Sequence, residues 1–226
     1  MPTLYFCGID TGIGKSVATG LMARYLLERE EPVITQKLVQ TGCSGRPEDI
    51  VTHRRLMESG WLDEDEQGLT CPYCFPFAGS PHLAARLAGR IIDADRISAA
   101  TRRLEQAYRW TLAEGAGGLL VPFNDNLTQL DYLGAQHHPL VLVTSSRLGS
   151  INHTLMSLEI LRARRQPLAG LVYNLFGGGP DEIVRDSLRL FSRALQENGF
   201  ADNIVVLPPW PHSGGAEWHR LLDQAA

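Results

Sequence analysis

The sequence contains no apolar run long enough to cross a membrane. Its longest apolar stretches, residues 139–143 and 168–173, fall far short of the roughly 20 residues that a spanning helix needs. The first residues also lack the basic segment that opens a secretory signal peptide, because a short apolar run follows Thr3 directly and Asp10 comes soon after it. These absences predict a protein of the cytoplasm with no membrane partner.

An excess of positive charge is also missing. The formal net charge is -4 at pH 7, so the chain shows no overall attraction for nucleic acid, and we expect no such partner. Lysine itself is nearly absent, because only Lys15 and Lys37 among the 21 basic residues are lysine. A chain that uses arginine elsewhere but keeps lysine at two positions indicates that these positions need a compact ammonium group.

Cysteine is scarce, and a chain of 226 residues does not need a disulfide framework to fold. Cys71 and Cys74 form a Cys-x-x-Cys pair, but a structural zinc site needs two further ligands at comparable spacing. Neither Cys43 nor a nearby histidine pair supplies them. We interpret the cysteines as reduced thiols in a packed strand or loop, with a metal or redox pair as the alternative.

What the sequence has instead is a regular alternation of apolar, strand-like runs and amphipathic, helix-like stretches. This alternation predicts an α/β fold, a doubly wound and mostly parallel sheet with helices on both faces, as one P-loop NTPase-like domain over residues 1–226. Residues 60–79 carry little pattern and are predicted to be a loop-rich insertion. Strands are predicted over 3–7, 33–38, 110–114, 140–145, 168–174 and 204–207, and helices over 16–30, 48–59, 81–88, 95–108, 128–137, 151–165 and 181–198.

A glycine-rich loop follows the first predicted strand. Residues 8–16 read G-I-D-T-G-I-G-K-S and lead into a helical pattern, which is the order of a phosphate-binding loop, although five residues instead of four separate the outer glycines. In such loops backbone N–H groups surround phosphate oxygens, the lysine reaches the β- and γ-phosphates, and the hydroxyl meets Mg²⁺. The loop therefore predicts a nucleotide site made by Gly12, Ile13, Gly14, Lys15, Ser16 and Val17.

Acidic residues are predicted at the same edge of the sheet. Mg²⁺ on a nucleotide needs one or two carboxylates besides the loop hydroxyl. Glu114 ends a predicted strand and leads into residues 115–118, G-A-G-G, which we interpret as a flexible turn. Asp49 stands at the head of a predicted helix, where metal binding and helix capping are equal alternatives. Lys37 ends the second predicted strand, so we expect both lysines beside these carboxylates.

Two later strand ends also look suited to ligands. The side-chain amide of Asn174 offers a donor and an acceptor, which would suit the edge of an adenine base. Residues 147–153 open a predicted helix, whose free N–H groups could receive an anion such as a carboxylate. A role as an ordinary turn or cap residue is the alternative for both.

Five motifs occur in order along nearly the whole chain, and together they resemble the dethiobiotin synthetase family. These enzymes are the ATP-dependent carboxylases of biotin synthesis. The sequence departs from the family pattern at Gly12, where an acidic residue is common, and at Leu38, where proline is common. The motifs are G-x-D-T-x-x-G-K-[ST] at 8–16, K-x-V-x-[ST]-G at 37–42, S-P-H at 80–82, E-G-A-G-G at 114–118 and L-G-x-I-N-H at 148–153.

The resemblance implies a reaction and a set of residue roles. A diamine, 7,8-diaminononanoate, takes up CO₂ or bicarbonate as a carbamate, ATP converts the carbamate to a carbamic-phosphoric anhydride, and the second amine closes the ring. The resemblance also implies a homodimer in which each subunit completes the substrate site of the other. The roles implied are catalysis by Thr11, Lys15 and Lys37; Mg²⁺ binding by Ser16, Asp49 and Glu114; substrate binding by Lys37, Thr41, Gly117 and Gly118 and by the partner's Gly149, Ser150, Ile151 and Asn152; and adenine binding by Asn174, Pro208 and Pro209.

Two other functions fit a phosphate-binding loop. A partition-type P-loop ATPase typically carries an additional lysine early in the loop and often a membrane-seeking tail, whereas Ile9 and Asp10 occupy the loop here and residues 215–226 have no basic face. A nucleotide-binding regulatory module without turnover is the second alternative, because Gly12 and Leu38 depart from the family pattern.

Overall fold

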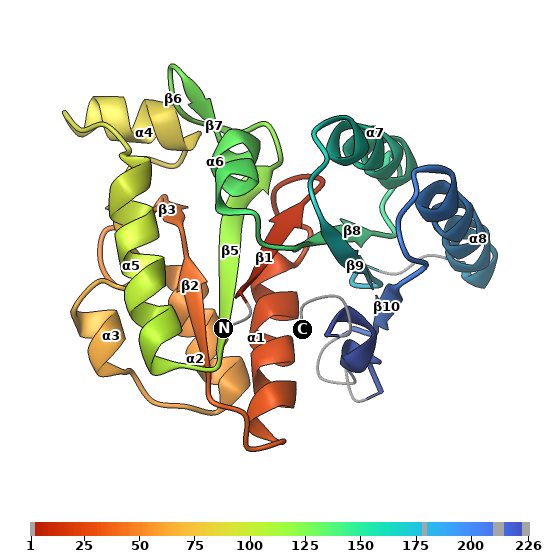
Figure 1. The fold of residues 1–226 in the computed structure, drawn as a ribbon, viewed down its shortest axis with the longest axis horizontal. Coiled ribbons are helices and arrows are strands. Elements are labelled where there is room, and N and C mark those ends of the chain that lie inside the picture. Colours follow the sequence, from red (N-terminus) through yellow and green to blue (C-terminus); the bar gives the residue numbers. More distant parts are fainter. Residues whose placement is uncertain (1–2, 178–179, 210–214, 223–226) are drawn as a thin grey trace.

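The fold is built around a parallel sheet, seen in a computed structural model that describes residues 3–177, 180–209 and 215–222. Six strands lie in the order β10-β9-β8-β1-β5-β2, and every neighbouring pair is parallel (Figure 1). The predicted α/β fold of P-loop type is confirmed. The strands are β1 (Thr3–Gly8), β2 (Val33–Lys37), β5 (Trp110–Gly118), β8 (Leu140–Ser145), β9 (Leu168–Asn174) and β10 (Ile204–Leu207).

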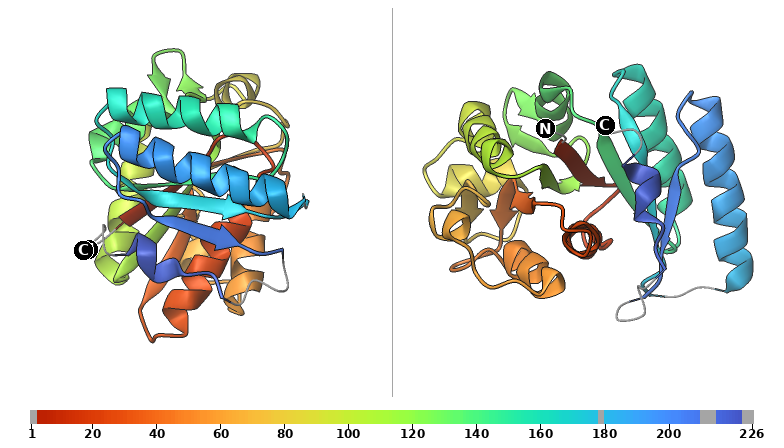
Figure 2. Two further views of the ribbon diagram at one scale, coloured as in Figure 1. Left: turned by 90° about the vertical axis from the view of Figure 1, so that its right-hand side faces the viewer. Right: turned by 60° about the horizontal axis from the view of Figure 1, so that its bottom comes forward.

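Alternating strand residues point into two separate apolar cores, one on each face of the sheet. In β1, Leu4 and Phe6 pack into the core under α1 and α2, whereas Tyr5 and Cys7 pack into the core on the opposite face. Strands covered on both faces have no solvent side, which explains the continuous apolar runs in β1, β8 and β10. The helices are α1 (Lys15–Leu27), α2 (Glu48–Met57) and η1 (Trp218–Leu221) on one face, and α5 (Ala94–Ala107), α6 (Gln129–Gln136), α7 (Ser150–Ala163) and α8 (Asp181–Glu197) on the other (Figure 2).

Residues 60–79 are more ordered than we predicted. They contain the short helix α3 (Asp63–Glu66) and the strand β4 (Tyr73–Phe75), which pairs in parallel with β3 (Val39–Thr41). A buried ion pair holds this segment to α2, because Arg54 Nη2 lies 2.7 Å from Asp65 Oδ1. The prediction of a loop-rich insertion was therefore wrong in part. Beyond it lie α4 (Pro81–Leu87) and the antiparallel pair β6 (Pro122–Asn124) and β7 (Leu127–Thr128).

The glycine-rich segment after Glu114 is strand and not the flexible turn that we predicted. β5 continues through Gly118, and the buried side chain of Gln129 holds its last residues. The Gln129 amide accepts from Ala116 N at 2.7 Å and donates to Gly118 O at 3.2 Å. Gly118 also pairs with Gly8 of β1 after a register shift between the two strands. A side chain from α6 thus supplements the strand pairing there and holds the backbone in place.

All four cysteines are free thiols. Cys7, Cys43 and Cys71 are buried, and Cys74 on β4 is half-buried. Within the residues that the structure describes, no three His, Cys, Asp or Glu side chains gather as a metal site. None of the helices described is both long and apolar enough to cross a membrane.

Candidate functional site

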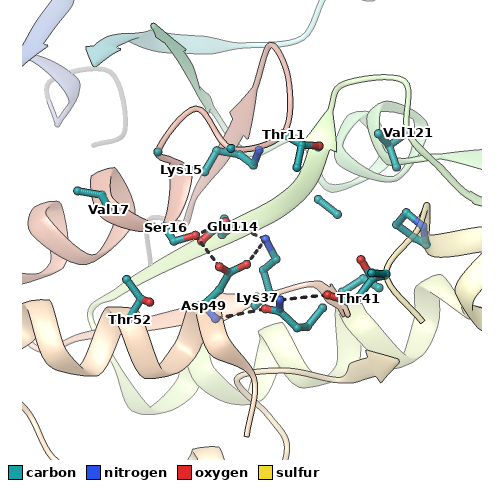
Figure 3. A pocket seen from close by; sticks show the side chains of 18 of the residues that line it. Thr11, Lys15, Ser16, Val17, Lys37, Thr41, Asp49, Thr52, Glu114 and Val121 are labelled. Carbon is teal, nitrogen blue, oxygen red and sulfur yellow. Dashed lines mark hydrogen bonds and ion pairs between the residues drawn. The ribbon is translucent and has the colours of Figure 1, made fainter. Parts of the chain in front are cut away.

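A cavity of about 980 Å³ lies at the carboxyl ends of β2 and β5, next to the phosphate loop (Figure 3). The start of α2 forms one wall, and residues 78–81 close the side beyond β3. This is the edge of a parallel sheet where ligands collect, because the following helices point their N-termini toward it. The predicted site residues that line the cavity are Thr11, Gly12, Gly14, Lys15, Ser16, Val17, Lys37, Thr41, Asp49, Glu114, Gly117, Asn174 and Pro208.

Other predicted site residues do not line this cavity. The side chain of Ile13 is buried below the loop, and Gly118 and Pro209 lie next to lining residues without lining it themselves. The segment 149–152 lies at the start of α7, where Ser150 borders a separate hollow of about 200 Å³ together with Asp10 and Arg147. The assignment of residues 149–152 to the substrate of a second subunit stays a prediction.

The phosphate loop depends on two glycines with left-handed backbone angles. Gly12 has φ 69° and Gly14 has φ 94°, a region that residues with a side chain rarely adopt. A Cβ atom on Gly14 would also overlap the side chain of Asn174. Lys15 bends back over the loop, and its Nζ donates to Asp10 O at 2.8 Å. The loop therefore has the shape of an anion cradle before any ligand binds.

On the other wall, two carboxylates surround Lys37. Its Nζ lies 2.6 Å from Asp49 Oδ2 and 2.7 Å from Glu114 Oε1, and it also donates to Gly115 O at 2.9 Å. Lys37 and Glu114 are register partners on β2 and β5, so their side chains leave the sheet together. The Ser16 hydroxyl completes the group, at 2.7 Å from Asp49 Oδ1 and 3.0 Å from Glu114 Oε1 (Figure 3).

These contacts shift the pKa values of the buried groups in different directions. Burial, reinforced by the charge of Lys37, lowers the pKa of Lys15. Burial also acts to lower the pKa of Lys37, but the Glu114 and Asp49 carboxylates outweigh it and raise that pKa overall. Burial acts to raise the pKa of Glu114, but Lys37 and a hydrogen bond from His53 hold it well below its usual range. Lys37 and Glu114 therefore form a charged pair at neutral pH.

The donor set fits Mg²⁺. Ser16, Asp49 and Glu114 present one hydroxyl and two carboxylates toward a common point, and oxygen is the ligand atom that Mg²⁺ prefers. The N-cap position of α2 is Pro47, whereas the Asp49 side chain turns to Ser16 and Lys37. The capping alternative for Asp49 does not describe this structure. The nucleotide phosphates and water would supply the remaining ligands of the ion.

Asn174 has a structural contact that its sequence position did not reveal. Its Nδ2 donates to Ile13 O at 2.8 Å, and its Oδ1 accepts from Phe176 N at 3.0 Å. The side chain thus ties the phosphate loop to the end of β9. It still borders the cavity with Phe176 and Pro208, so the predicted contact with adenine remains a prediction.

Several residues of the site were missed in the sequence. Thr52 and Arg55 on α2 line the cavity, and so do Ser80 and Pro81, although the Ser-Pro-His motif was recognised. His53 contacts Glu114 from within α2, with Nε2 at 2.8 Å from Oε2. Helical spacing was the available signal for His53, because Asp49 and a residue four positions later share one helix face.

The comparison with curated proteins shows the family of this chain. A family model described as AAA domain matches residues 2–198. An ATP-dependent dethiobiotin synthetase BioD 2 of Pasteurella multocida (strain Pm70) is 45% identical over 193 residues, or 85% of this chain and 91% of the relative. The chain belongs to the dethiobiotin synthetase family. A second dethiobiotin synthetase, BioD of Chlorobaculum tepidum, is 47% identical over 203 residues, or 90% of this chain and 85% of the relative. The family resemblance inferred from the five motifs is confirmed.

More distant solved structures share only the fold of this dethiobiotin synthetase family member. A ParA family ATPase from Chlorobium tepidum TLS superposes with a TM-score of 0.54 at 13% identity, covering 99% of this chain and 90% of that one. The MinD cell division protein of Aquifex aeolicus superposes with a TM-score of 0.56 at 11% identity, covering 100% and 86%. Both support the P-loop architecture of the phosphate loop and sheet.

Proposed function

We propose that this protein is an ATP- and Mg²⁺-dependent dethiobiotin synthetase. It carboxylates 7,8-diaminononanoate with CO₂ or bicarbonate and closes the ring of dethiobiotin at the expense of ATP. The observation that carries the proposal is the cavity in which Lys15 and Lys37 flank Ser16, Asp49 and Glu114. Close relatives named as dethiobiotin synthetases support the same substrate and reaction.

The phosphate loop binds the triphosphate of ATP. Its backbone N–H groups and the α1 N-terminus face the cavity, and Lys15 supplies a positive charge for the β- and γ-phosphates. Because burial already lowers the pKa of Lys15, an approaching phosphate provides the counter-charge that this ammonium lacks. Ser16, Asp49 and Glu114 would hold Mg²⁺, which would neutralise part of the phosphate charge.

Lys37 stands where the carbamate and the transferred phosphoryl group meet. Its ammonium offsets the negative charge that gathers when one anion attacks another, and Thr11 and Thr41 border the same space. The attacking atoms belong to the substrates. A carbamate oxygen attacks the γ-phosphorus of ATP as ADP leaves, and the second amine then attacks the carbamoyl carbon as phosphate leaves. The protein therefore contributes position and charge and no nucleophile of its own.

The substrate chain extends from Lys37 past Thr41 and Gly117. Beyond them the cavity is bordered by Ala78, Pro81 and Val121, which suit the methylene chain of the diamine. The substrate carboxylate is bound by the start of α7 from the partner subunit of a homodimer. The reaction takes place in the cytoplasm.

The decisive experiment measures product and phosphate together. Purified protein is incubated with ATP, MgCl₂, bicarbonate and 7,8-diaminononanoate, and dethiobiotin is detected by mass spectrometry. We expect product and a phosphate release that requires the diamine. Phosphate release that ignores the diamine would indicate a partition-type ATPase, and the absence of both signals would indicate a binding module without turnover.

A further inference from the structure

His53 is a buried histidine in contact with the carboxylates of the cavity. It lies on α2 with a side chain that is 0% exposed, and its Nε2 is 2.8 Å from Glu114 Oε2. It does not line the cavity itself. Substrates therefore cannot touch it, and any influence on the reaction has to pass through Glu114.

The two oxygens of Glu114 have separate partners. Oε1 faces the cavity, where Lys37 Nζ lies at 2.7 Å and Ser16 Oγ at 3.0 Å. Oε2 faces away and meets His53. Since a carboxylate accepts only, the Nε2 of His53 carries the proton of this hydrogen bond. The imidazole thus fixes the rotation of the carboxylate about its last bond and keeps Oε1 turned toward Ser16.

The other ring nitrogen makes a purely structural role for His53 a poor explanation. Nδ1 is buried and has no hydrogen-bond partner among the residues described. An unpaired buried acceptor destabilises a fold, whereas leucine at this position would fill similar space without that loss. The bond that Nε2 makes to Glu114 is therefore the feature that favours histidine here.

The helix α2 brings this contact and a second carboxylate to the site together. His53 follows Asp49 by four residues, so both side chains lie on the face of α2 that meets the sheet. A single rigid helix thus supplies Asp49 directly and orients Glu114 indirectly. Movement of α2 would disturb both carboxylates at once.

We propose that His53 is a positioning residue that orients Glu114 for Mg²⁺ binding. Partners of this kind fix the orientation of metal-binding side chains in many metal sites, and their loss typically weakens metal binding by about 10- to 100-fold. This inference rests on the proposed Mg²⁺ site of Ser16, Asp49 and Glu114.

The test compares two variants that differ in one donor. His53→Gln places an amide N–H close to the position of Nε2, whereas His53→Leu keeps the volume and removes the donor. Binding of Mn²⁺ as a spin probe is measured by electron paramagnetic resonance with a non-hydrolysable ATP analogue. We expect about tenfold weaker binding for His53→Leu and near wild-type binding for His53→Gln, following the usual effect of such partners.

Two controls separate this role from a loss of stability. Leu195→Ala removes a fully buried side chain from α8, away from the cavity, and is expected to lower the melting temperature without changing Mn²⁺ binding. In turnover assays, His53→Leu is expected to raise the Mg²⁺ concentration needed for half-maximal rate while leaving the KM for the diamine unchanged. Equal Mn²⁺ binding by His53→Leu and wild type would overturn the proposal, and so would failure of His53→Gln to restore binding.

The same assay distinguishes failure of the metal site from failure of the positioning role. Glu114→Gln removes a proposed metal ligand and is expected to weaken Mn²⁺ binding more than His53→Leu. If Glu114→Gln binds Mn²⁺ as wild type does, the proposed Mg²⁺ site is wrong. If Glu114→Gln is weakened and His53→Leu is not, the metal site stands and only the role of His53 is rejected.

Discussion

The two walls of the cavity give a buried lysine opposite surroundings. We call the phosphate loop, residues 8–16, the loop wall, and the ends of β2 and β5 with the start of α2 the sheet wall. On the loop wall, Lys15 donates to a backbone oxygen, Asp10 O, and burial lowers its pKa. On the sheet wall, Lys37 lies between Asp49 and Glu114, which raise its pKa. Both side chains are buried, so the difference arises from the neighbours of each ammonium and not from exposure.

This difference shows how the folded chain prepares for a highly charged ligand. On the sheet wall each charged group has an opposite charge beside it before ligands bind, because the one ammonium of Lys37 contacts the carboxylates of both Asp49 and Glu114. Among the described residues, the ammonium on the loop wall donates a hydrogen bond to a neutral carbonyl and forms no ion pair with a carboxylate. Under the proposed function, that wall gains its counter-charge from the phosphates of ATP, so nucleotide affinity is obtained at the expense of the stability of the empty protein.

The largest effect is expected from Lys37→Met. The change leaves Glu114 and Asp49 without the ammonium that lies 2.6–2.7 Å from their oxygens. Breaking a buried pair from one side costs about 3–5 kcal/mol of unfolding free energy. Loss of a charge that stabilises the transition state lowers kcat by about 100-fold or more. Urea unfolding and steady-state kinetics measure the two effects, and unchanged stability would contradict a stabilising role for the ion pairs of Lys37.

Lys15→Met is the matched change on the loop wall. We expect ATP affinity to fall by about 100-fold, because a hydrogen bond to a charged group contributes up to about 3 kcal/mol. The stability of the nucleotide-free protein should hold or rise slightly, since a cation with a lowered pKa is removed from a buried position. Nucleotide titration and urea unfolding give both values. A stability loss as large as that of Lys37→Met would mean that the walls do not differ.

A pair of glycine substitutions tests how tightly the loop wall is shaped. Gly14→Ala adds a Cβ that overlaps Asn174 at φ 94°, whereas Gly12→Ala adds one into open space at φ 69°. Left-handed backbone strain costs about 1–3 kcal/mol, and we place Gly12→Ala near the low end and Gly14→Ala at the high end. Thermal unfolding measures both. An equal drop in melting temperature for Gly12→Ala and Gly14→Ala would show that the Asn174 side chain moves aside without cost.

The opposite pKa shifts of Lys15 and Lys37 predict opposite, smaller effects of pH on the free energy of unfolding. Unfolded lysine titrates near 10.4, and the lowered pKa of Lys15 means that the unfolded state binds more protons just below that pH. The contribution of Lys15 to stability therefore rises as the pH approaches 10.4, by less than about 1.4 kcal/mol per pH unit. Lys37 has a raised pKa, so its contribution to the free energy of unfolding is complete below pH 10.4. That contribution is lost progressively as the pH rises from 10.4 toward the higher pKa of the folded state.

Urea unfolding between pH 8 and 10 tests this sign. The wild-type protein and Lys15→Met are compared at each pH, so that titration of other groups cancels. We expect the wild type to gain stability relative to the variant as the pH rises. A constant difference between the two would show that the pKa of Lys15 is not lowered by folding.

The smallest effect is expected from Cys74→Ser, next to the sheet wall but outside the cavity. The thiol donates weakly to Cys43 O at 3.7 Å, and burial raises its pKa to about 12, so it is a poor nucleophile at neutral pH. We expect unchanged kcat and a stability change of less than about 1 kcal/mol. Loss of activity together with bound zinc in the wild type would overturn the interpretation of these thiols as inert.

The six strands of the central sheet could be predicted because both of their faces are buried. Such strands favour apolar residues at successive positions, and these were visible in the sequence, for example at residues 140–143 and 204–207. β3 and β4 were not visible, because they have three residues each and pair with each other across a long separation in the sequence. The end of β5 was read as a turn from its glycines, whereas Gln129 from another element holds it as strand.

Some residues of the candidate site could be predicted from the sequence and others could not. Lys15, Lys37 and Glu114 could be predicted because each lies at the carboxyl end of a strand or in the loop after one, and such positions meet at one edge. His53 was missed although it follows Asp49 by four residues, because helical spacing places it on the same face of α2 but does not show which strand residue that face meets. The role of Asp49 was left open for the same reason until the side-chain direction was seen.

The register of two strands also sets which insertions this protein can accept. Lys37 pairs with Glu114 at the end of a run that begins with Val33 opposite Trp110. One extra residue inside β2 would turn Lys37 to the other face, because strand side chains alternate. Residues 44–46 after β3 are exposed and carry no such constraint. Length variation among natural or engineered versions of this chain should therefore occur in its loops. The number of residues from Val33 to Lys37, and from Trp110 to Glu114, should stay constant.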